Sequence, residues 1–140
     1  KLIFVKQGAD LQASTISQRE VSKFIDVYDL DAHVEKIKKV YARRRDLMLK
    51  TMEEEFPKCV KFTHPQGGLF TWVVLPENIK AAEMATKCLE KNVAYVPGDS
   101  FFPNGGVYNC CRLNYSNMPE DKIVEGIKRM GQVLREELGE

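Results

Sequence analysis

Residues 110–116 read Cys-Cys-Arg-Leu-Asn-Tyr-Ser, and their alternation predicts a strand whose two faces differ in character. Cys111 and Leu113 share one face with the following tyrosine and are expected to meet helices. Cys110 and Arg112 point to the opposite face. An arginine there is solvated, paired with an acid or directed at a ligand, because its planar fork binds a carboxylate through two parallel hydrogen bonds. On this pattern alone, a salt bridge on the surface or between domains remains the alternative to ligand binding.

The sequence on either side predicts short strands alternating with amphipathic helices. Helical periodicity covers residues 1–28, with a polar break at 12–17, and continues in a helix that Asp29 or Asp31 caps and Pro57 ends. The remaining expected elements are, in order, strands at 60–64 and 69–75 around a Pro-Gln-Gly-Gly turn, a helix after Pro76, strands at 93–96 and 108–116, and a helix after Pro119. This order predicts an α+β fold, with helices on one face of a small, mostly antiparallel sheet of about four strands, preceded by a helical arm.

Three finer expectations concern single elements. The strand at 69–75 carries aromatic and β-branched residues on both faces, which favours a central position covered on both sides. The consecutive arginines at 43–45 favour a solvated helix face. The helix after Pro76 is expected to end at Asn92 and to bury an apolar stripe formed by Ile79, Ala82, Ala85 and Leu89.

Composition excludes several classes of protein. The net charge of +1 gives no strong bias toward nucleic acid. No apolar run approaches the ~20 residues of a membrane span, and no leader pattern precedes the first helix. The histidines, His33 and His64, are interpreted as surface or turn residues. The cysteines form no C-x-x-C pair, which argues against a metal site, and we interpret them as reduced thiols in the core of a cytoplasmic protein: Cys59, Cys88, Cys110 and Cys111.

Several short motifs occur in a fixed order along the chain. They are Lys6-Gln7 with Asp10-Leu11 and Ser14, Tyr41 with Arg44-Arg45-Asp46, Pro65-Gln66-Gly67-Gly68-Leu69-Phe70-Thr71-Trp72, Val96-Pro97-Gly98 with Phe101-Phe102, and Arg112-Leu113-Asn114-Tyr115-Ser116. Together they resemble the class I/II aminotransferases of the fold-type-I pyridoxal-phosphate enzymes, in the branch of the 2-aminoadipate and kynurenine aminotransferases. The resemblance covers nearly the whole chain. It implies a helical arm at 1–28 that belongs to or leads from a large domain, and the family's C-terminal small domain at 29–140.

The resemblance also implies roles for single residues. Arg112 matches the arginine that grips the substrate α-carboxylate, and Phe70 matches a position that can line the substrate pocket. Leu11 and Ser14 match a segment that approaches the partner subunit's cofactor site across a dimer interface. For Phe70, Leu11 and Ser14, plain packing is an equally good interpretation. The intact protein is then expected to be a homodimer that uses pyridoxal 5'-phosphate to transfer an amino group between an amino acid and a 2-oxo acid.

The sequence departs from the family at the cofactor attachment point. The family's Schiff-base lysine lies in an S-x-S-K stretch, whereas Ser22-Lys23 is followed by Phe24 and nothing else fits. We therefore assign no catalytic residue within the chain, and we expect it alone to be inactive and not to hold the cofactor. Two alternatives remain. One is the C-terminal part of a winged-helix transcription regulator with an aminotransferase-like body, which would bind DNA, and the other is a stand-alone ligand-binding domain.

Overall fold

The computed structural model describes residues 1–140 and divides them into two compact units, 1–38 and 39–140. The first unit contains α1 (Leu2–Ala9), α2 (Thr15–Val27) and the start of α3 (Leu30–Glu55). The predicted break between two arm helices is confirmed, although it falls earlier than 12–17. The amide of Gln12 donates to Asp10 Oδ1 at 3.1 Å, and Ser14 caps α2. Asp29 caps α3 by accepting from the amide of Ala32 at 2.9 Å, as predicted.

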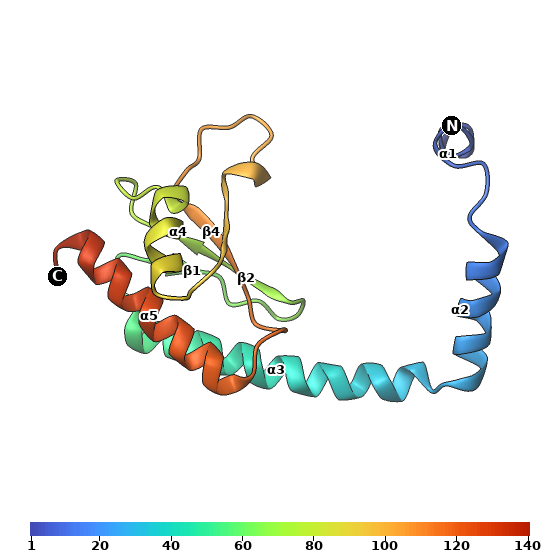
Figure 1. Cartoon of the computed structure of the whole chain (residues 1–140), viewed down its shortest axis with the longest axis horizontal. Coiled ribbons are helices and arrows are strands. Elements are labelled where there is room, and N and C mark those ends of the chain that lie inside the picture. Colours follow the sequence, from blue (N-terminus) through green and yellow to red (C-terminus); the bar gives the residue numbers. More distant parts are fainter. The chain divides into compact units, whose positions relative to one another are not determined.

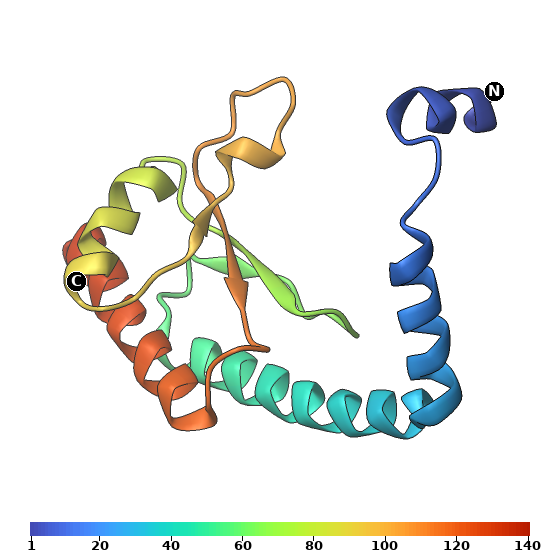
Figure 2. The same ribbon diagram turned by 45° about the vertical axis from the view of Figure 1, so that its right-hand side comes forward.

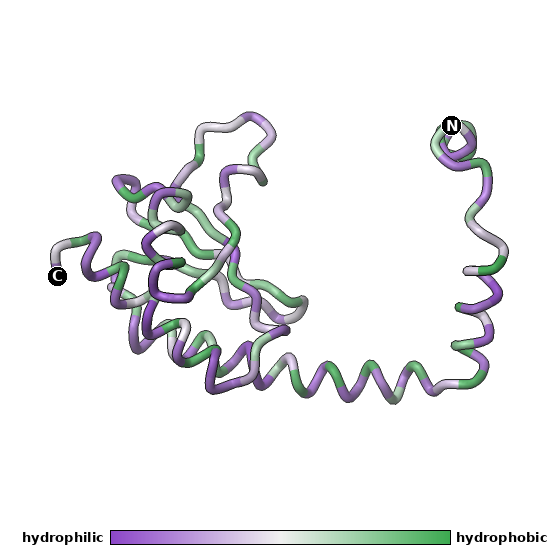
Figure 3. The backbone as a smooth tube through the Cα atoms, viewed as in Figure 1, coloured by the Kyte–Doolittle hydropathy of each residue, from purple (hydrophilic) through white to green (hydrophobic).

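The helices of the first unit bury none of their residues. Hydrophobic and hydrophilic stretches alternate along α2 in Figure 3, so the helix has an apolar side without a covering layer inside the unit. Phe24 and Tyr28 stack at 4.7 Å between ring centroids, and both remain more than half exposed. An amphipathic helix gains most of its stability by packing its apolar side, and α2 has no such packing within this unit.

The second unit holds a four-stranded antiparallel sheet, shown in Figures 1 and 2. The strands lie in the order β1-β2-β4-β3, so the two longest strands occupy the centre. After α3, the elements are β1 (Lys61–Phe62), β2 (Phe70–Val74), α4 (Ala81–Glu90), β3 (Val96–Pro97), the 3₁₀ turn η1 (Asp99–Phe101), β4 (Cys110–Asn114) and α5 (Glu120–Leu138). The predicted α+β class and element order are confirmed. None of the helices combines the length and apolar composition that crossing a bilayer requires.

One face of the sheet packs against helices and forms the core. Cys111, Leu113 and Tyr115 point to this face, as the alternation predicted, and all three are buried. Two residues of β2, Thr71 and Val73, are buried beside them. The helices contribute further large core residues, among them Met48, Met52, Met84, Ile123, Ile127, Met130 and Leu134.

The C-terminal end of α3 lies close against α5. A Cβ added at Gly131 would lie 2.7 Å from the carbonyl oxygen of Glu55, so only glycine allows this approach. Arg135 of α5 donates to the same carbonyl at 2.6 Å and satisfies one of the carbonyls that a helix end leaves free. This contact fixes α3 in the layer that supports the sheet.

The structure corrects the predicted stripe of α4. The helix begins at Ala81, later than expected, and buries Ala81, Met84 and Cys88, whereas Leu89 is 58% exposed. The phase is set before the helix starts, because the amide of Ala81 donates to the carbonyl of Tyr108 at 2.7 Å and turns Ala81 toward the core. Ile79 is buried as predicted, and Asn92 adopts the left-handed conformation of a helix end at φ 58°.

Two further expectations are wrong in part. β2 is central, as predicted, but only one of its faces is fully buried, and Phe70 on the other face is 39% exposed. Cys110 shares the outer face with Arg112 but is buried, since the backbone of Gly98 crosses it. Cys88, Cys110 and Cys111 are buried free thiols, whereas Cys59 is exposed and is not a core residue.

Candidate functional site

Strand pairing places Arg112 in the middle of the sheet's outer face. β4 lies between β2 and β3, so Arg112 is paired with Trp72 on one side and with Val96 on the other. Phe70 is paired with Asn114 and therefore lies diagonally from Arg112, within reach of a long side chain. The register of three strands thus gathers an arginine and two aromatic residues at one place.

The guanidinium group of Arg112 contacts aromatic rings and no acid. Its central carbon lies 4.0 Å from the centroid of Phe70 and 4.7 Å from that of Phe101. No carboxylate of the chain lies within 4.0 Å of its nitrogens, and Nε is buried without a hydrogen-bond partner. The salt bridge that the pattern allowed is therefore absent within the chain. A buried, unpaired guanidinium nitrogen is costly, which makes an acceptor from outside the chain the expected partner.

Phe101 joins the site from a turn whose conformation the sequence did not reveal. It ends η1, which follows β3, and its ring meets Trp72 at 5.6 Å with an interplanar angle of 80°. The turn can lie this close because the amide of Gly98 donates to the carbonyl of Cys110 at 2.7 Å, where a side chain would clash. The Val-Pro-Gly stretch before two aromatic residues is the signal that points to this arrangement.

The arginines at 43–45 are not a uniformly solvated face. Arg43 is exposed and pairs with Glu120. Arg44 is half-buried and donates to the carbonyl of Ser116, whereas Arg45 donates to the carbonyl of Gln66 at 3.1 Å. The carbonyl of Gln66 lies in the turn between β1 and β2, and that of Ser116 lies in the segment between β4 and α5. The prediction failed for two of the three residues because long-range carbonyl partners leave no trace in local charge patterning.

Leu11 and Ser14, the residues predicted to approach the partner subunit's cofactor site, belong to the first unit. Leu11 is 82% exposed and therefore does not pack within that unit. Ser14 has a local structural task, because its hydroxyl accepts from the amide of Ser17 at 3.5 Å at the start of α2. Their role across a subunit interface stays a prediction.

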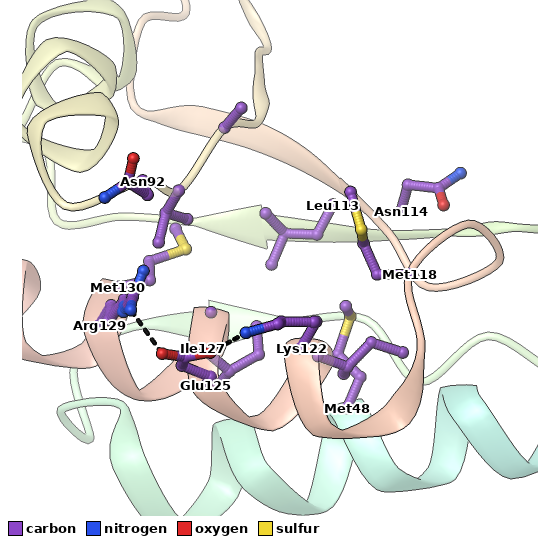
Figure 4. Close-up of a pocket in the computed structure, with 14 residues that line it drawn as sticks. Met48, Asn92, Leu113, Asn114, Met118, Lys122, Glu125, Ile127, Arg129 and Met130 are labelled. Carbon is purple, nitrogen blue, oxygen red and sulfur yellow. Dashed lines mark hydrogen bonds and ion pairs between the residues drawn. The ribbon is translucent and has the colours of Figure 1, made fainter.

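A separate pocket of about 400 Å³ lies on the helix side of the sheet, lined by α5 and by residues such as Met48, Leu113 and Met118 (Figure 4). Its charges are matched internally. Lys122 and Arg129 both pair with Glu125, and these cations hold the pKa of that carboxyl below its usual range. Leu113 and Arg112 alternate along β4, so this pocket and the aromatic face lie on opposite sides of the sheet.

The chain is similar along its length to known aminotransferases. It is 46% identical over 138 residues to aromatic-amino-acid aminotransferase 1 of Thermococcus litoralis, covering 99% of this chain and 33% of that protein. Two solved structures superpose on it. One is a kynurenine aminotransferase of Pyrococcus horikoshii, with TM-score 0.88 and 42% identity over 96% of this chain and 33% of that one. The other is an alpha-aminoadipate aminotransferase of Thermus thermophilus in complex with N-(5'-phosphopyridoxyl)-L-leucine, with TM-score 0.87 and 37% identity over 96% and 34%.

The chain belongs to the aminotransferase family. It corresponds to a C-terminal part of these proteins and spans about a third of the length of the curated relatives it matches. No family model matches this aminotransferase chain. A transcriptional regulator of Bacillus subtilis, of the helix-turn-helix type, is also similar, at 26% identity over 136 residues, 97% of this chain and 28% of that protein.

Proposed function

We propose that in the intact protein this chain supplies the substrate-carboxylate site of a pyridoxal-phosphate-dependent aminotransferase that acts on an amino acid and a 2-oxo acid. The observation that carries the proposal is Arg112, whose guanidinium group lies against two aromatic rings, has no carboxylate within salt-bridge distance and, unlike that of Arg44, makes no hydrogen bond within the chain. A substrate α-carboxylate is the group that such a fork accepts. Phe70 lines the same place, in keeping with its proposed contact to substrate.

The chemistry explains why the arginine is kept unpaired. A bidentate contact to the carboxylate fixes the orientation of the substrate and lowers the entropic cost of reaching the reactive geometry. The two aromatic rings keep water from part of the guanidinium group, which strengthens its attraction for an anion. Pyridoxal phosphate, when bound, supplies the electron sink for chemistry at the substrate α-carbon. The part of the work we assign to this chain is binding and orientation.

The lysine that would hold the cofactor is proposed to lie outside this chain. A Schiff-base lysine needs a neutral amine and therefore a lowered pKa. Carboxylate hydrogen bonds raise the pKa of four lysines, namely Lys38, Lys80, Lys87 and Lys122. These pairs disfavour the neutral amine at those four positions, and our expectation that the chain alone is inactive rests on the missing S-x-S-K stretch, since Ser22-Lys23 does not fit it.

The arm at 1–28 is proposed to pack against the rest of the intact protein, with 29–140 forming the small domain. Its support is the apolar surface of α1 and α2, where Phe4 is 76% exposed and Ile16 is 71% exposed. In a homodimer this segment would bring Leu11 and Ser14 to the partner subunit's cofactor site. A regulator with an aminotransferase-like body is the second candidate, favoured by the similarity to the Bacillus subtilis protein. Sequence-specific DNA binding by the intact protein, without transaminase activity, would select it.

The test of the proposed function is Arg112→Lys in the full-length protein. Lysine keeps the charge but loses the planar fork, so it cannot replace two parallel hydrogen bonds. We expect the affinity for the amino-acid substrate, and for the unreactive carboxylate 3-phenylpropionate, to fall about 10- to 100-fold, the loss of one or two charge-assisted bonds. Cofactor affinity should change less than about twofold. Calorimetry measures the affinity for 3-phenylpropionate, and absorbance titration measures the affinity for the cofactor.

Arg129→Lys is the matched control, because Arg129 lies at the pocket on the helix side and already pairs with Glu125. It should leave both affinities near those of the unmodified protein. An Arg112→Lys protein that binds 3-phenylpropionate as tightly as the control would refute the assignment of Arg112.

A further inference from the structure

We propose that Arg44 and Arg45 of α3 are positioning residues for the carboxylate site. The guanidinium group of Arg44 holds the segment that follows β4, the strand of Arg112, and that of Arg45 holds the turn that precedes β2, the strand of Phe70. The proposal rests on the proposed function of Arg112. It adds two residues that touch neither substrate nor cofactor and act through the geometry of the sheet.

Arg44 holds the segment that follows β4. Its Nη1 donates to the carbonyl of Ser116, which lies 72 residues further along the chain. The same segment is ordered by Asn114, whose Oδ1 accepts from the amides of Ser116 and Asn117 at 2.9 and 3.0 Å. The strand that carries Arg112 therefore ends in a turn fastened both to its own last residue and to α3.

Arg45 holds the turn that precedes β2. It donates to the carbonyl of Gln66 at 3.1 Å, and its side chain is only 22% exposed. The next carbonyl, that of Gly67, accepts from the hydroxyl of Tyr115 at 3.1 Å. Tyr115 belongs to the segment after β4, so the two strand ends are also joined to each other. Arg44, Arg45 and Tyr115 thus form one set of contacts around the adjacent ends of β2 and β4, the strands that carry Phe70 and Arg112.

The sheet's own hydrogen bonds do not replace these contacts. The β2–β4 pairing runs from Phe70 opposite Asn114 to Val74 opposite Cys110, and one backbone hydrogen bond, from Tyr115 to Leu69 at 3.1 Å, extends it at this end, so the carbonyls of Gln66 and Ser116 still lie outside it. Charged donors form the stronger hydrogen bonds to such carbonyls. Because a bidentate contact tolerates displacements of only about 0.5 Å, a small shift of either strand end moves the fork away from its ligand.

Loss of Arg44 should move the site without unfolding the chain. α3 is fixed to the core by other residues, among them Met48 and Met52, which are buried on the helix side. The expected consequence is a looser segment after β4 and weaker carboxylate binding. A purely structural contact would lower stability and leave the affinity of the folded protein unchanged.

The test compares Arg44→Ala with Arg43→Ala in the full-length holoenzyme. Arg43 is the neighbouring arginine on α3, is exposed, and pairs with Glu120 of α5, so its removal takes away the same charge without touching a strand end. Two quantities are measured: the affinity for 3-phenylpropionate by calorimetry, and amide hydrogen exchange of the peptide covering residues 112–118. The second does not depend on turnover.

We expect Arg44→Ala to weaken 3-phenylpropionate binding at least fivefold and to speed exchange in residues 112–118 at least tenfold. Arg43→Ala should change both less than twofold, and Arg44→Lys, which keeps a cationic donor, should recover part of each loss. If Arg44→Ala does not fold, Arg45→Ala is judged by the same affinity criterion, with exchange measured over residues 65–70. The proposal is overturned if Arg44→Ala binds 3-phenylpropionate as tightly as Arg43→Ala does. Where Arg45→Ala replaces Arg44→Ala, the same comparison with Arg43→Ala decides.

The outcome for Arg112 separates this proposal from the proposed function. If Arg112→Lys weakens binding and Arg44→Ala does not, the carboxylate site stands and the positioning role fails. If Arg112→Lys has no effect, the proposed function fails first, and the positioning role fails with it.

Discussion

The two faces of the sheet are formed by the same strands, but one buries apolar side chains and the other partly buries a guanidinium group. On the helix side, Cys111 and Leu113 are 0% and 5% exposed among apolar neighbours. Arg112 lies between these two residues along the strand and points to the outer side. Its Nε is buried without a hydrogen-bond partner, and its guanidinium group lies against the partly exposed rings of Phe70 and Phe101. The apolar residues of the helix side pack as in a stable core. The outer side breaks the rules of such a core, and positions that break them are where binding sites are expected.

The difference separates stability from function along one strand. Burying the apolar set stabilises the fold in proportion to the area removed from water. Keeping a guanidinium group free of acids costs stability, since a pairing acid would satisfy it. A residue on the helix side should therefore matter for folding, and its neighbour on the outer side should matter for binding.

The largest effect should come from Leu113→Ala. Leu113 is buried in the core and also lines the pocket of Figure 4, so the shortened side chain should leave a cavity that the neighbours fill only in part. We expect the free energy of unfolding to fall by about 3 kcal/mol. Arg112→Ala should change it by less than about 1 kcal/mol in either direction, because it removes a weak ring contact together with an unpaired donor.

Urea unfolding of the two variants, followed by far-ultraviolet circular dichroism, measures this difference. If Arg112→Ala destabilises the chain as much as Leu113→Ala does, the outer face is a second core, and the separation we draw between the faces is wrong.

The sequence predicted the contrast between these faces but not its details. Alternation alone placed Leu113 inward and Arg112 outward, because a strand has a period of two and the register then follows. It could not show that Cys110 is covered, since the cover is the backbone of Gly98 in a turn. The stripe of α4 was displaced by one residue, because a hydrogen bond to the distant Tyr108 sets the phase of the helix.

The same limit applies to the candidate site. Arg112 and Phe70 could be named from the motifs, since both lie in strands with recognisable sequences. The contact of Phe101 and the bonds of Arg44 and Arg45 could not, because each depends on how loops far apart in sequence meet. Local patterns specify which face a residue takes, and tertiary contacts decide what it touches there.

A smaller effect should come from a buried thiol on the helix side, which makes the free energy of unfolding depend on pH. Burial raises the pKa of Cys88 from 9.0 to about 11. The unfolded chain therefore releases this proton first as pH rises, so stability is complete below pH 9 and is lost toward pH 11. We expect a loss of about 2 kcal/mol across that interval from this thiol. Burial also raises the pKa of Cys111, which acts in the same direction.

The measurement is the urea midpoint at several pH values from 8 to 11. Cys88→Ala should flatten the decline, whereas Cys59→Ala should not, because Cys59 is exposed. Identical slopes in the two variants would show that the helix side tolerates the thiolate, contrary to the contrast between the faces.

The smallest effect on stability should come from Phe101→Ala, and it tests how the outer face holds Arg112. The ring is 44% exposed, so its loss removes one cation–π contact and one edge contact with Trp72, together about 1 kcal/mol. Phe102→Ala is the matched variant, because Phe102 meets Trp72 at 6.1 Å but does not lie over Arg112.

The readout is the Nε–Hε resonance of Arg112 in a nuclear magnetic resonance spectrum, which a ring within 5 Å displaces through its ring current. Phe101→Ala should move this resonance toward the position of a free arginine, and Phe102→Ala should leave it nearly in place. Equal movement in both variants would mean that the turn as a whole positions the guanidinium group. Movement in Phe101→Ala alone would assign that role to one aromatic side chain. An aromatic ring can hold the guanidinium group in place and, unlike a carboxylate, leaves its hydrogen-bond donors free for a ligand.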